Sequence, residues 1–144
     1  MKIVGLEAMN TESAQFAKSL VPYGDRATIV ALSGDLGVGK TSYVQGVARA
    51  LGVRDKVTSP TFVLEKIYNL ENQKFSRLVH IDAYRLNGIE ELHAIGWDDI
   101  VTDPNNLILI EWPEKVANAI PKSAIRISLE GSGESREIMY ASAC

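Results

Sequence analysis

Apolar positions along the first third of the chain form two different patterns, a continuous run and a helical spacing. Residues 27–33 are nearly all apolar or β-branched, which is typical of a strand buried on both faces of a parallel sheet. Further on, apolar residues recur at the spacing of one helix face, and Gly52 stands where a left-handed C-terminal cap is expected. The pattern predicts a central strand followed by an amphipathic helix, whose inward stripe is Val44, Val47, Ala48 and Leu51.

The N-terminal segment predicts one more strand and one more helix. Residues 2–7 alternate weakly, as in a short strand, and Asn10 and Thr11 can cap a helix that ends at Pro22 and Gly24. The residues of this helix that we expect to face the core are Ala14, Ala17, Leu20 and Val21.

Hairpins dominate the second half of the pattern. The second half of residues 60–68 and residues 77–82 predict two strands joined by a polar turn, and therefore an antiparallel hairpin. Residues 89–99 predict a helix with Leu92 and Ile95 inward, and residues 106–111 predict another apolar strand. The C-terminal segment alternates on both sides of a turn at residues 131–133. The expected fold is a three-layer α/β domain with a mixed sheet of parallel strands and antiparallel hairpins.

Length and composition restrict the setting. The 144 residues fit one domain spanning 1–144, and no apolar run approaches the length of a membrane span. The N-terminus lacks the apolar core of a secretory signal, so we expect a cytoplasmic protein. A net charge of −3 with scattered basic residues predicts no basic patch for binding DNA or RNA. We therefore expect any tRNA to be held by a partner. The single cysteine, Cys144, excludes an internal disulfide.

The segment between the central strand and its helix carries a phosphate-binding motif. Residues 34–41 fit the pattern G-x-x-x-x-G-K-[ST], whose glycines let backbone N–H groups and a helix N-terminus approach a polyphosphate. Lys40 is expected to contact the β- and γ-phosphates, and the Thr41 hydroxyl to ligate Mg²⁺. The sequence therefore predicts a P-loop NTPase. Its candidate phosphate-binding residues are Gly34, Asp35, Leu36, Gly37, Val38, Gly39, Lys40 and Thr41, with Ser42 as a second hydroxyl.

Two acids stand where a magnesium partner is expected. Asp82 and Glu111 each follow four largely apolar residues of a predicted strand, and ligands of open α/β sheets gather at the carboxyl ends of strands. One could hold the metal while the other orients the attacking water; the residues alone do not rank them. Thr61, after Ser59 and Pro60, fits a switch segment and an ordinary strand start equally well.

A histidine and a tryptophan lie beside these acids. His80 lies inside an apolar strand, where a satisfied core histidine is favoured over a ligand or base. Trp112 follows Glu111 directly, and a core or interface role is favoured over a cofactor contact.

Several motifs in order resemble the TsaE (YjeE) family over nearly the whole chain. Besides the phosphate loop they are Ser-Pro-Thr-Phe at 59–62, His-Ile-Asp-Ala-Tyr-Arg-Leu at 80–86, Glu91 and Leu92 through Ile95 and Gly96, and Glu-Trp-Pro at 111–113. The resemblance implies a bacterial ATPase required for making threonylcarbamoyladenosine in tRNA, using ATP and Mg²⁺. It also implies that the protein acts on the TsaD–TsaB complex, resetting it between rounds, rather than catalysing the transfer.

The resemblance assigns roles to individual residues. Lys40 and the loop amides would bind the phosphates, Thr41 and Glu111 the magnesium, and Asp82 the water or the surrounding shell. Thr61 would serve the switch segment. Ser13 stands where the family has a threonine near the base, and Arg136 matches a family arginine, so both join the nucleotide-binding candidates.

Two other functions stay open at this stage. A small-molecule kinase would need an arginine-bearing lid, and no arginine-rich insertion separates Gly96 from Leu107. A nucleotide-gated binding module with negligible turnover would use the same loop. A GTPase is disfavoured because no Asn-Lys-x-Asp segment follows a late strand.

Overall fold

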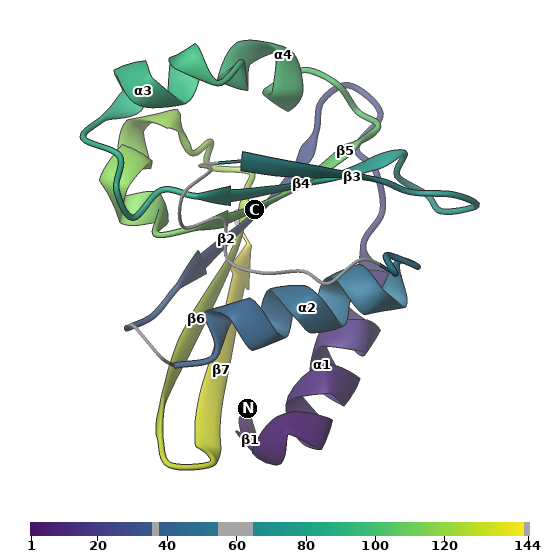
Figure 1. Cartoon of the computed structure of the whole chain (residues 1–144), viewed down its shortest axis with the longest axis vertical. Coiled ribbons are helices and arrows are strands. Elements are labelled where there is room, and N and C mark those ends of the chain that lie inside the picture. Colours follow the sequence, from purple (N-terminus) through teal and green to yellow (C-terminus); the bar gives the residue numbers. More distant parts are fainter. Residues whose placement is uncertain (36–37, 55–64, 143–144) are drawn as a thin grey trace.

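A seven-stranded mixed sheet forms the centre of the protein, in the strand order β1-β7-β6-β2-β5-β4-β3 (Figure 1). The computed structural model describes residues 1–35, 38–54 and 65–142, with the side chains of Ser132 and Ser142 excepted. Leu36, Gly37, Thr61 and Cys144 lie outside the described residues. The elements are β1 Lys2–Val4, α1 Gly5–Ser19, β2 Thr28–Ser33, α2 Lys40–Ala50, β3 Glu65–Asn69, β4 Arg77–Asp82, α3 Ile89–Ala94, α4 Trp97–Val101, β5 Asn106–Glu111, the 3₁₀ helix η1 Pro113–Ala119, β6 Ile125–Ser132 and β7 Ser135–Ser142.

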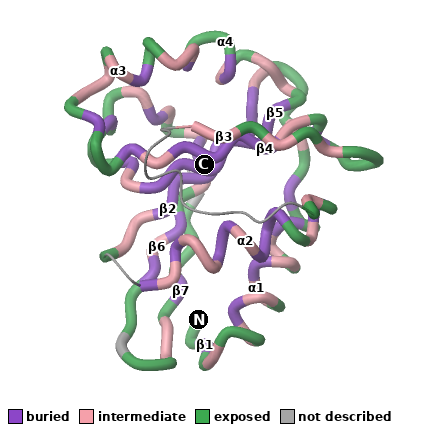
Figure 2. Tube along the Cα trace, viewed as in Figure 1, coloured by how far each residue is buried: buried purple, intermediate pink, exposed green. Residues whose placement is uncertain are grey.

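Helices cover both faces of the sheet and make three layers. Helices α1 and α2 lie together on one face, and α3, α4 and η1 lie on the other (Figure 1). Each face has its own apolar core, and the buried residues concentrate in the central strands between them (Figure 2). This confirms the three-layer α/β fold with a mixed sheet. No described helix has both the length and the apolar character needed to cross a membrane.

The parallel strands are the ones that carry the candidate site. Strand β2 lies between β5 and β6 and is parallel to both, and β4 is parallel to β5. The predicted hairpins are present as the antiparallel pairs β3–β4 and β6–β7, and β1 adds to β7. The carboxyl ends of β2, β5 and β4 therefore meet at one edge of the sheet.

The first helix begins earlier than the sequence predicted. It starts at Gly5 rather than after Thr11, whose hydroxyl donates to the carbonyl of Glu7 within the helix, so the predicted strand 2–7 shortens to β1. The cap prediction was wrong because a hydroxyl can bond to its own helix as readily as to a helix end. Val21 was also wrongly placed in the core: it is 61% exposed.

Two later boundaries also differ from the prediction. The helix expected over 89–99 is two short helices, because Gly96 adopts a left-handed conformation at φ 88° and separates α3 from α4. Strand β6 continues through Ser132, so the turn falls at residues 133–134 rather than 131–133.

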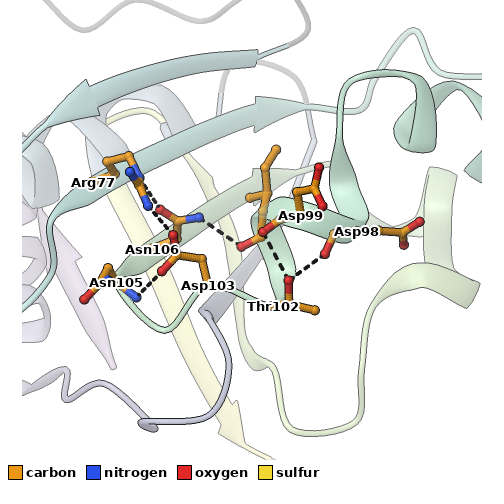
Figure 3. A network of polar contacts seen from close by, with 8 residues as sticks. Arg77, Asp98, Asp99, Thr102, Asp103, Asn105 and Asn106 are labelled. Atoms are coloured by element: carbon orange, nitrogen blue, oxygen red, sulfur yellow. Dashed lines mark hydrogen bonds and ion pairs between the residues drawn. The ribbon is translucent and has the colours of Figure 1, made fainter.

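A polar network fixes the edge of the sheet opposite the candidate site. Arg77, at the start of β4, donates to Asn106 at the start of β5 (2.7 Å) and pairs with Asp103 (Figure 3). Asn106 in turn donates to the carbonyl of Ile100 at the end of α4 (2.9 Å). The network aligns the amino ends of β4 and β5, so their carboxyl ends stay in register.

Candidate functional site

The phosphate loop joins β2 to α2 and packs against β6. Gly34 has φ 154°, and a Cβ there would lie 2.7 Å from the carbonyl oxygen of Leu129, so only glycine allows this approach. Gly39 has φ 107° and precedes the first residue of α2. The loop therefore delivers the chain to a helix N-terminus at the carboxyl edge of the sheet, as the motif predicts.

Lys40 is buried at the start of α2. Its Nζ donates to the carbonyl of Gly34 (2.5 Å) and lies 3.5 Å from the centre of the Trp112 ring. Burial lowers the pKa of Lys40, and the nearby acids Glu111, Glu114, Asp82 and Asp35 partly offset that effect. The ammonium is thus held inside the loop by one carbonyl and one aromatic face.

The two candidate acids lie side by side. Asp82 and Glu111 are register partners at the ends of β4 and β5, and Glu111 is also the partner of Leu32 in β2. Glu111 is only 3% exposed, and its Oε2 lies 2.6 Å from His80 Nε2. Asp82 is half-buried and accepts the N–H of Tyr84 through Oδ1 (3.0 Å). The structure brings both acids to the strand edge from which the phosphate loop departs.

These residues suit Mg²⁺ bound together with a nucleotide. The described residues contain no group of three or more His, Cys, Asp or Glu side chains that could hold a metal by themselves. Mg²⁺ commonly takes one or two protein oxygens and completes its shell with phosphates and water. Thr41, in the first turn of α2, and buried Glu111 supply oxygens of that kind.

One aromatic ring, Trp112, covers the lysine and contacts a second ring, Tyr84. Trp112 adopts a left-handed conformation at φ 60°, and its ring centre lies 5.0 Å from that of Tyr84. The Lys115 ammonium lies 5.8 Å from the centre of the Tyr84 ring. The sequence favoured a core or interface role for Trp112; the structure places its ring against the phosphate-loop lysine. The sequence signal for this placement is that Trp112 directly follows the candidate acid Glu111.

A cavity of about 280 Å³ opens on the other side of the loop. Three parts of the chain form it: the start of α1, the loop with the first turn of α2, and the β6–β7 turn. Arg136 lines it and donates to the carbonyls of Val38 (2.6 Å) and Gly133 (2.6 Å). The sequence singled out Gly39, Ser42 and Arg136 but missed the other lining residues. Those at the start of α1 were missed because the first helix was expected to begin later. The lining residues are Gly5, Leu6, Met9, Gly39, Ser42, Gly133, Glu134 and Arg136.

Ser13 lies apart from this cavity. Its side chain is completely buried, donates to the carbonyl of Asn10 (3.1 Å) and faces Gly46 of α2. Because the contact between α1 and α2 covers the hydroxyl, Ser13 supports the helix packing here. Ser13 does not line the cavity and is not part of the proposed nucleotide site.

The chain is similar to one protein family along most of its length. Residues 7–138 match the family model described as threonylcarbamoyl adenosine biosynthesis protein TsaE. Three proteins bearing the name tRNA threonylcarbamoyladenosine biosynthesis protein TsaE are among its relatives. The one from Borreliella burgdorferi is 38% identical over 113 residues, which cover 76% of this chain and 80% of that protein. The one from Treponema pallidum is 36% identical over 118 residues (81% and 84%), and the one from Bacillus subtilis 30% over 142 residues (97% and 86%).

A solved structure has the same fold. The crystal structure of Bacillus subtilis YdiB matches with a TM-score of 0.79 and 24% identity, covering 100% of this chain and 84% of that one. The family match extends from α1 to β7 and includes the phosphate loop, Asp82 and Glu111. This chain belongs to the TsaE family.

Proposed function

We propose that this protein binds ATP with Mg²⁺ and hydrolyses it in support of tRNA threonylcarbamoyladenosine synthesis. The observation that carries the proposal is the meeting of Lys40, Asp82 and Glu111 beside a phosphate loop in a member of the TsaE family. The names of the relatives support the tRNA modification. The protein acts on the TsaD–TsaB complex, which holds the tRNA, and does not itself transfer the threonylcarbamoyl group.

Each part of the site has a task in this proposal. The loop amides and the N-terminus of α2 bind the phosphates, and Lys40 leaves the Gly34 carbonyl to contact the β- and γ-phosphates. Thr41 and Glu111 hold Mg²⁺, which neutralises charge developing on the phosphates when bound. Asp82, beside Glu111, orients the attacking water.

The cavity beside Gly39 and Ser42 is the proposed adenine site. Leu6 and Met9 give it apolar walls, and Glu134 and Arg136 give it polar ones. A pocket that combines apolar walls with a few polar groups suits a purine ring. It also lies next to the loop that binds the phosphates, as one nucleotide spanning both regions requires. Thr61 remains a proposed member of the switch segment.

Calorimetry and turnover measurements test the proposal together. We expect unaltered protein to bind ADP and ATP, and Lys40→Ala to abolish that binding, whereas exposed Lys122→Ala leaves it unchanged. Glu111→Gln should reduce Mg²⁺-dependent turnover at least about 100-fold while nucleotide affinity changes much less, because metal-bound charge acts mainly in the transition state.

ATP turnover measured with different partners distinguishes the proposed function from its alternatives. Stimulation of ATP hydrolysis by the TsaD–TsaB complex is the expected result. Phosphorylation of a small-molecule acceptor would establish a kinase instead, and tight ATP binding without turnover in any mixture would establish a nucleotide-gated module. Failure to bind either nucleotide, with Mg²⁺ or without it and with the complex present, would overturn the proposal.

A further inference from the structure

We propose that His80 is a positioning residue that fixes the Glu111 carboxylate for Mg²⁺. The proposal rests on the proposed function and adds to it a residue that contacts neither nucleotide nor metal. His80 Nε2 and Glu111 Oε2 lie 2.6 Å apart, and the two side chains are 0% and 4% exposed. The pair therefore occupies one carboxylate oxygen, Oε2, and leaves Oε1 as the oxygen for the cation.

The sheet register places His80 directly behind the acids. His80 and Asp82 are two residues apart on β4, so their side chains share a face, and Asp82 is the register partner of Glu111 on β5. His80 itself is paired with Leu109, whose side chain belongs to the core under α1 and α2. Histidine and both acids thus lie on the sheet face that carries the phosphate-loop helix, with the histidine one pair of residues earlier.

The hydrogen bonding of His80 is incomplete, which argues against a packing role alone. An ionised carboxylate can only accept, so Nε2 donates to Glu111 when that residue ligates a cation. Nδ1 is buried and has no hydrogen-bond partner among the described residues. A buried ring nitrogen without a hydrogen-bond partner lowers the stability of the folded protein. The neighbouring strand residues Leu78, Val79 and Ile81 are buried and apolar. Histidine at this position therefore differs from leucine chiefly by its hydrogen bond to Glu111.

A fixed carboxylate binds a metal better than a freely rotating one. Hydrogen bonds from the surrounding shell orient metal ligands, and their loss commonly costs about 10–100-fold in metal affinity or activity. Because Glu111 is only 3% exposed, water is poorly placed to replace the His80 donor. The expected consequence is a selective loss of metal affinity, with metal-free nucleotide binding retained.

The test compares two substitutions at His80 with a matched surface control. His80→Leu removes the donor in an apolar environment, and His80→Gln places an amide N–H near the position of Nε2. His93→Leu removes the other histidine–carboxylate pair, in which Nδ1 lies 3.1 Å from Asp98 on the surface. Electron paramagnetic resonance of Mn²⁺ in the presence of ADP measures metal affinity, and calorimetry with ADP alone measures nucleotide binding.

We expect His80→Leu to weaken Mn²⁺ affinity in the ADP complex about 10–100-fold. His80→Gln and His93→Leu should stay within about threefold of the unaltered protein, and all variants should keep metal-free ADP affinity. In a Glu111→Gln background, His80→Leu should cause no further loss of Mn²⁺ affinity, because the carboxylate it orients is gone.

Several outcomes would overturn the positioning role. Unchanged Mn²⁺ affinity in His80→Leu would do so, and so would parallel losses of ADP binding and thermal stability in both His80 variants, which would show a structural role. If His80→Leu does not fold, His80→Asn serves in its place, since its shorter amide is not expected to reach Glu111. Absence of Mn²⁺–ADP binding by the unaltered protein would overturn the proposed function as well, whereas intact binding by every variant would overturn only the role of His80.

Discussion

Lys40, the proposed phosphate-binding lysine, is held at a cost to the stability of the folded state. The residue is 5% exposed, and its Nζ donates a hydrogen bond to the Gly34 carbonyl. Burial dominates the lowering of its pKa even with four acids nearby. Folding therefore disfavours the charged form of this side chain relative to water, and a bound triphosphate would add negative charge to that of the four acids.

Lys40→Met should accordingly stabilise the nucleotide-free protein. Methionine keeps the length of the stem and removes the charge, so we expect a gain of about 1 kcal/mol, or roughly 2–4 °C in Tm, at pH 7. A lysine whose pKa is lowered on folding destabilises the folded protein fully at pH values below its folded pKa. This destabilisation fades as the pH rises toward 10.5, because the lysine then loses its charge in both states. The stabilisation by Lys40→Met should therefore shrink over the same pH range.

Thermal unfolding at pH 7 and near pH 10 measures both effects. The matched control is Lys122→Met at an exposed position, which should change Tm little at either pH. A lower Tm for Lys40→Met at pH 7 would contradict the argument, because it would mean that the contacts with Gly34 and Trp112 outweigh the burial of the charge.

At the scale of elements, the crossing of α1 and α2 sets the position of the phosphate loop. Gly46 of α2 faces Ser13 of α1 so closely that an added Cβ would overlap the Ser13 hydroxyl. The two helices can approach this closely only because one of the two residues has no side chain. Helix α2 begins at Lys40, so its distance from α1 also positions the lysine and the cavity beside Gly39.

Gly46→Ala should therefore destabilise the protein although alanine is the better helix former. An added Cβ would lie 1.8 Å from the Ser13 hydroxyl oxygen, so we expect a loss in the free energy of unfolding near the upper end of about 1–3 kcal/mol. That loss exceeds the gain of about 1 kcal/mol from helix propensity. Urea denaturation measures the change. In a Ser13→Gly background the same substitution should be neutral or stabilising; an equal loss in both backgrounds would show that Ser13 is not the obstacle.

The sequence predicted those elements whose signal is local. Residues 27–33 and the stripe from Val44 to Leu51 carry complete patterns, and the glycines and lysine of the loop stand at fixed spacing. The strand ends at Asp82 and Glu111 were predicted as well, although their direct pairing depends on the register of β4 and β5. The His80–Glu111 contact joins residues 31 positions apart, so no local pattern reports it.

The remaining errors have the same physical origin. Asn10 and Thr11 look like a cap when the chain is taken alone, but packing of Met9, Ser13 and Ala17 extends the helix back to Gly5. That shift moved Leu6 and Met9 into the helix and hence into the cavity wall. The position of the Trp112 ring depends on a left-handed backbone at a non-glycine residue, a conformation that tertiary contacts rather than sequence pattern impose.

At the scale of the whole molecule, both ends of the chain converge on the phosphate loop. Met9 of α1 would lie 3.3 Å from a Cβ at Gly39, and Arg136 of β7 bonds to the Val38 carbonyl within the loop. Strand β1 then pairs with β7, with Ile3 opposite Arg136, so the N-terminal and C-terminal segments support each other beside the site. The loop thus depends on contacts more than 90 residues away in sequence.

Arg136→Ala tests that dependence. Arg136 donates to the carbonyls of Val38, Gly133 and Ser135, and the first of these bonds holds the loop against the β6–β7 turn. A hydrogen bond from a charged donor contributes about 1.5–3 kcal/mol, so we expect ADP affinity measured by calorimetry to fall about 10-fold or more. Arg136→Lys should recover little of the lost ADP affinity, because one ammonium cannot reproduce the spread of guanidinium donors.

The control is Arg126→Ala, which replaces an exposed arginine on the adjacent strand β6 and should bind ADP normally. Normal ADP binding by Arg136→Ala would mean that the loop holds its shape without the C-terminal hairpin, and the dependence on both chain ends would then be limited to stability.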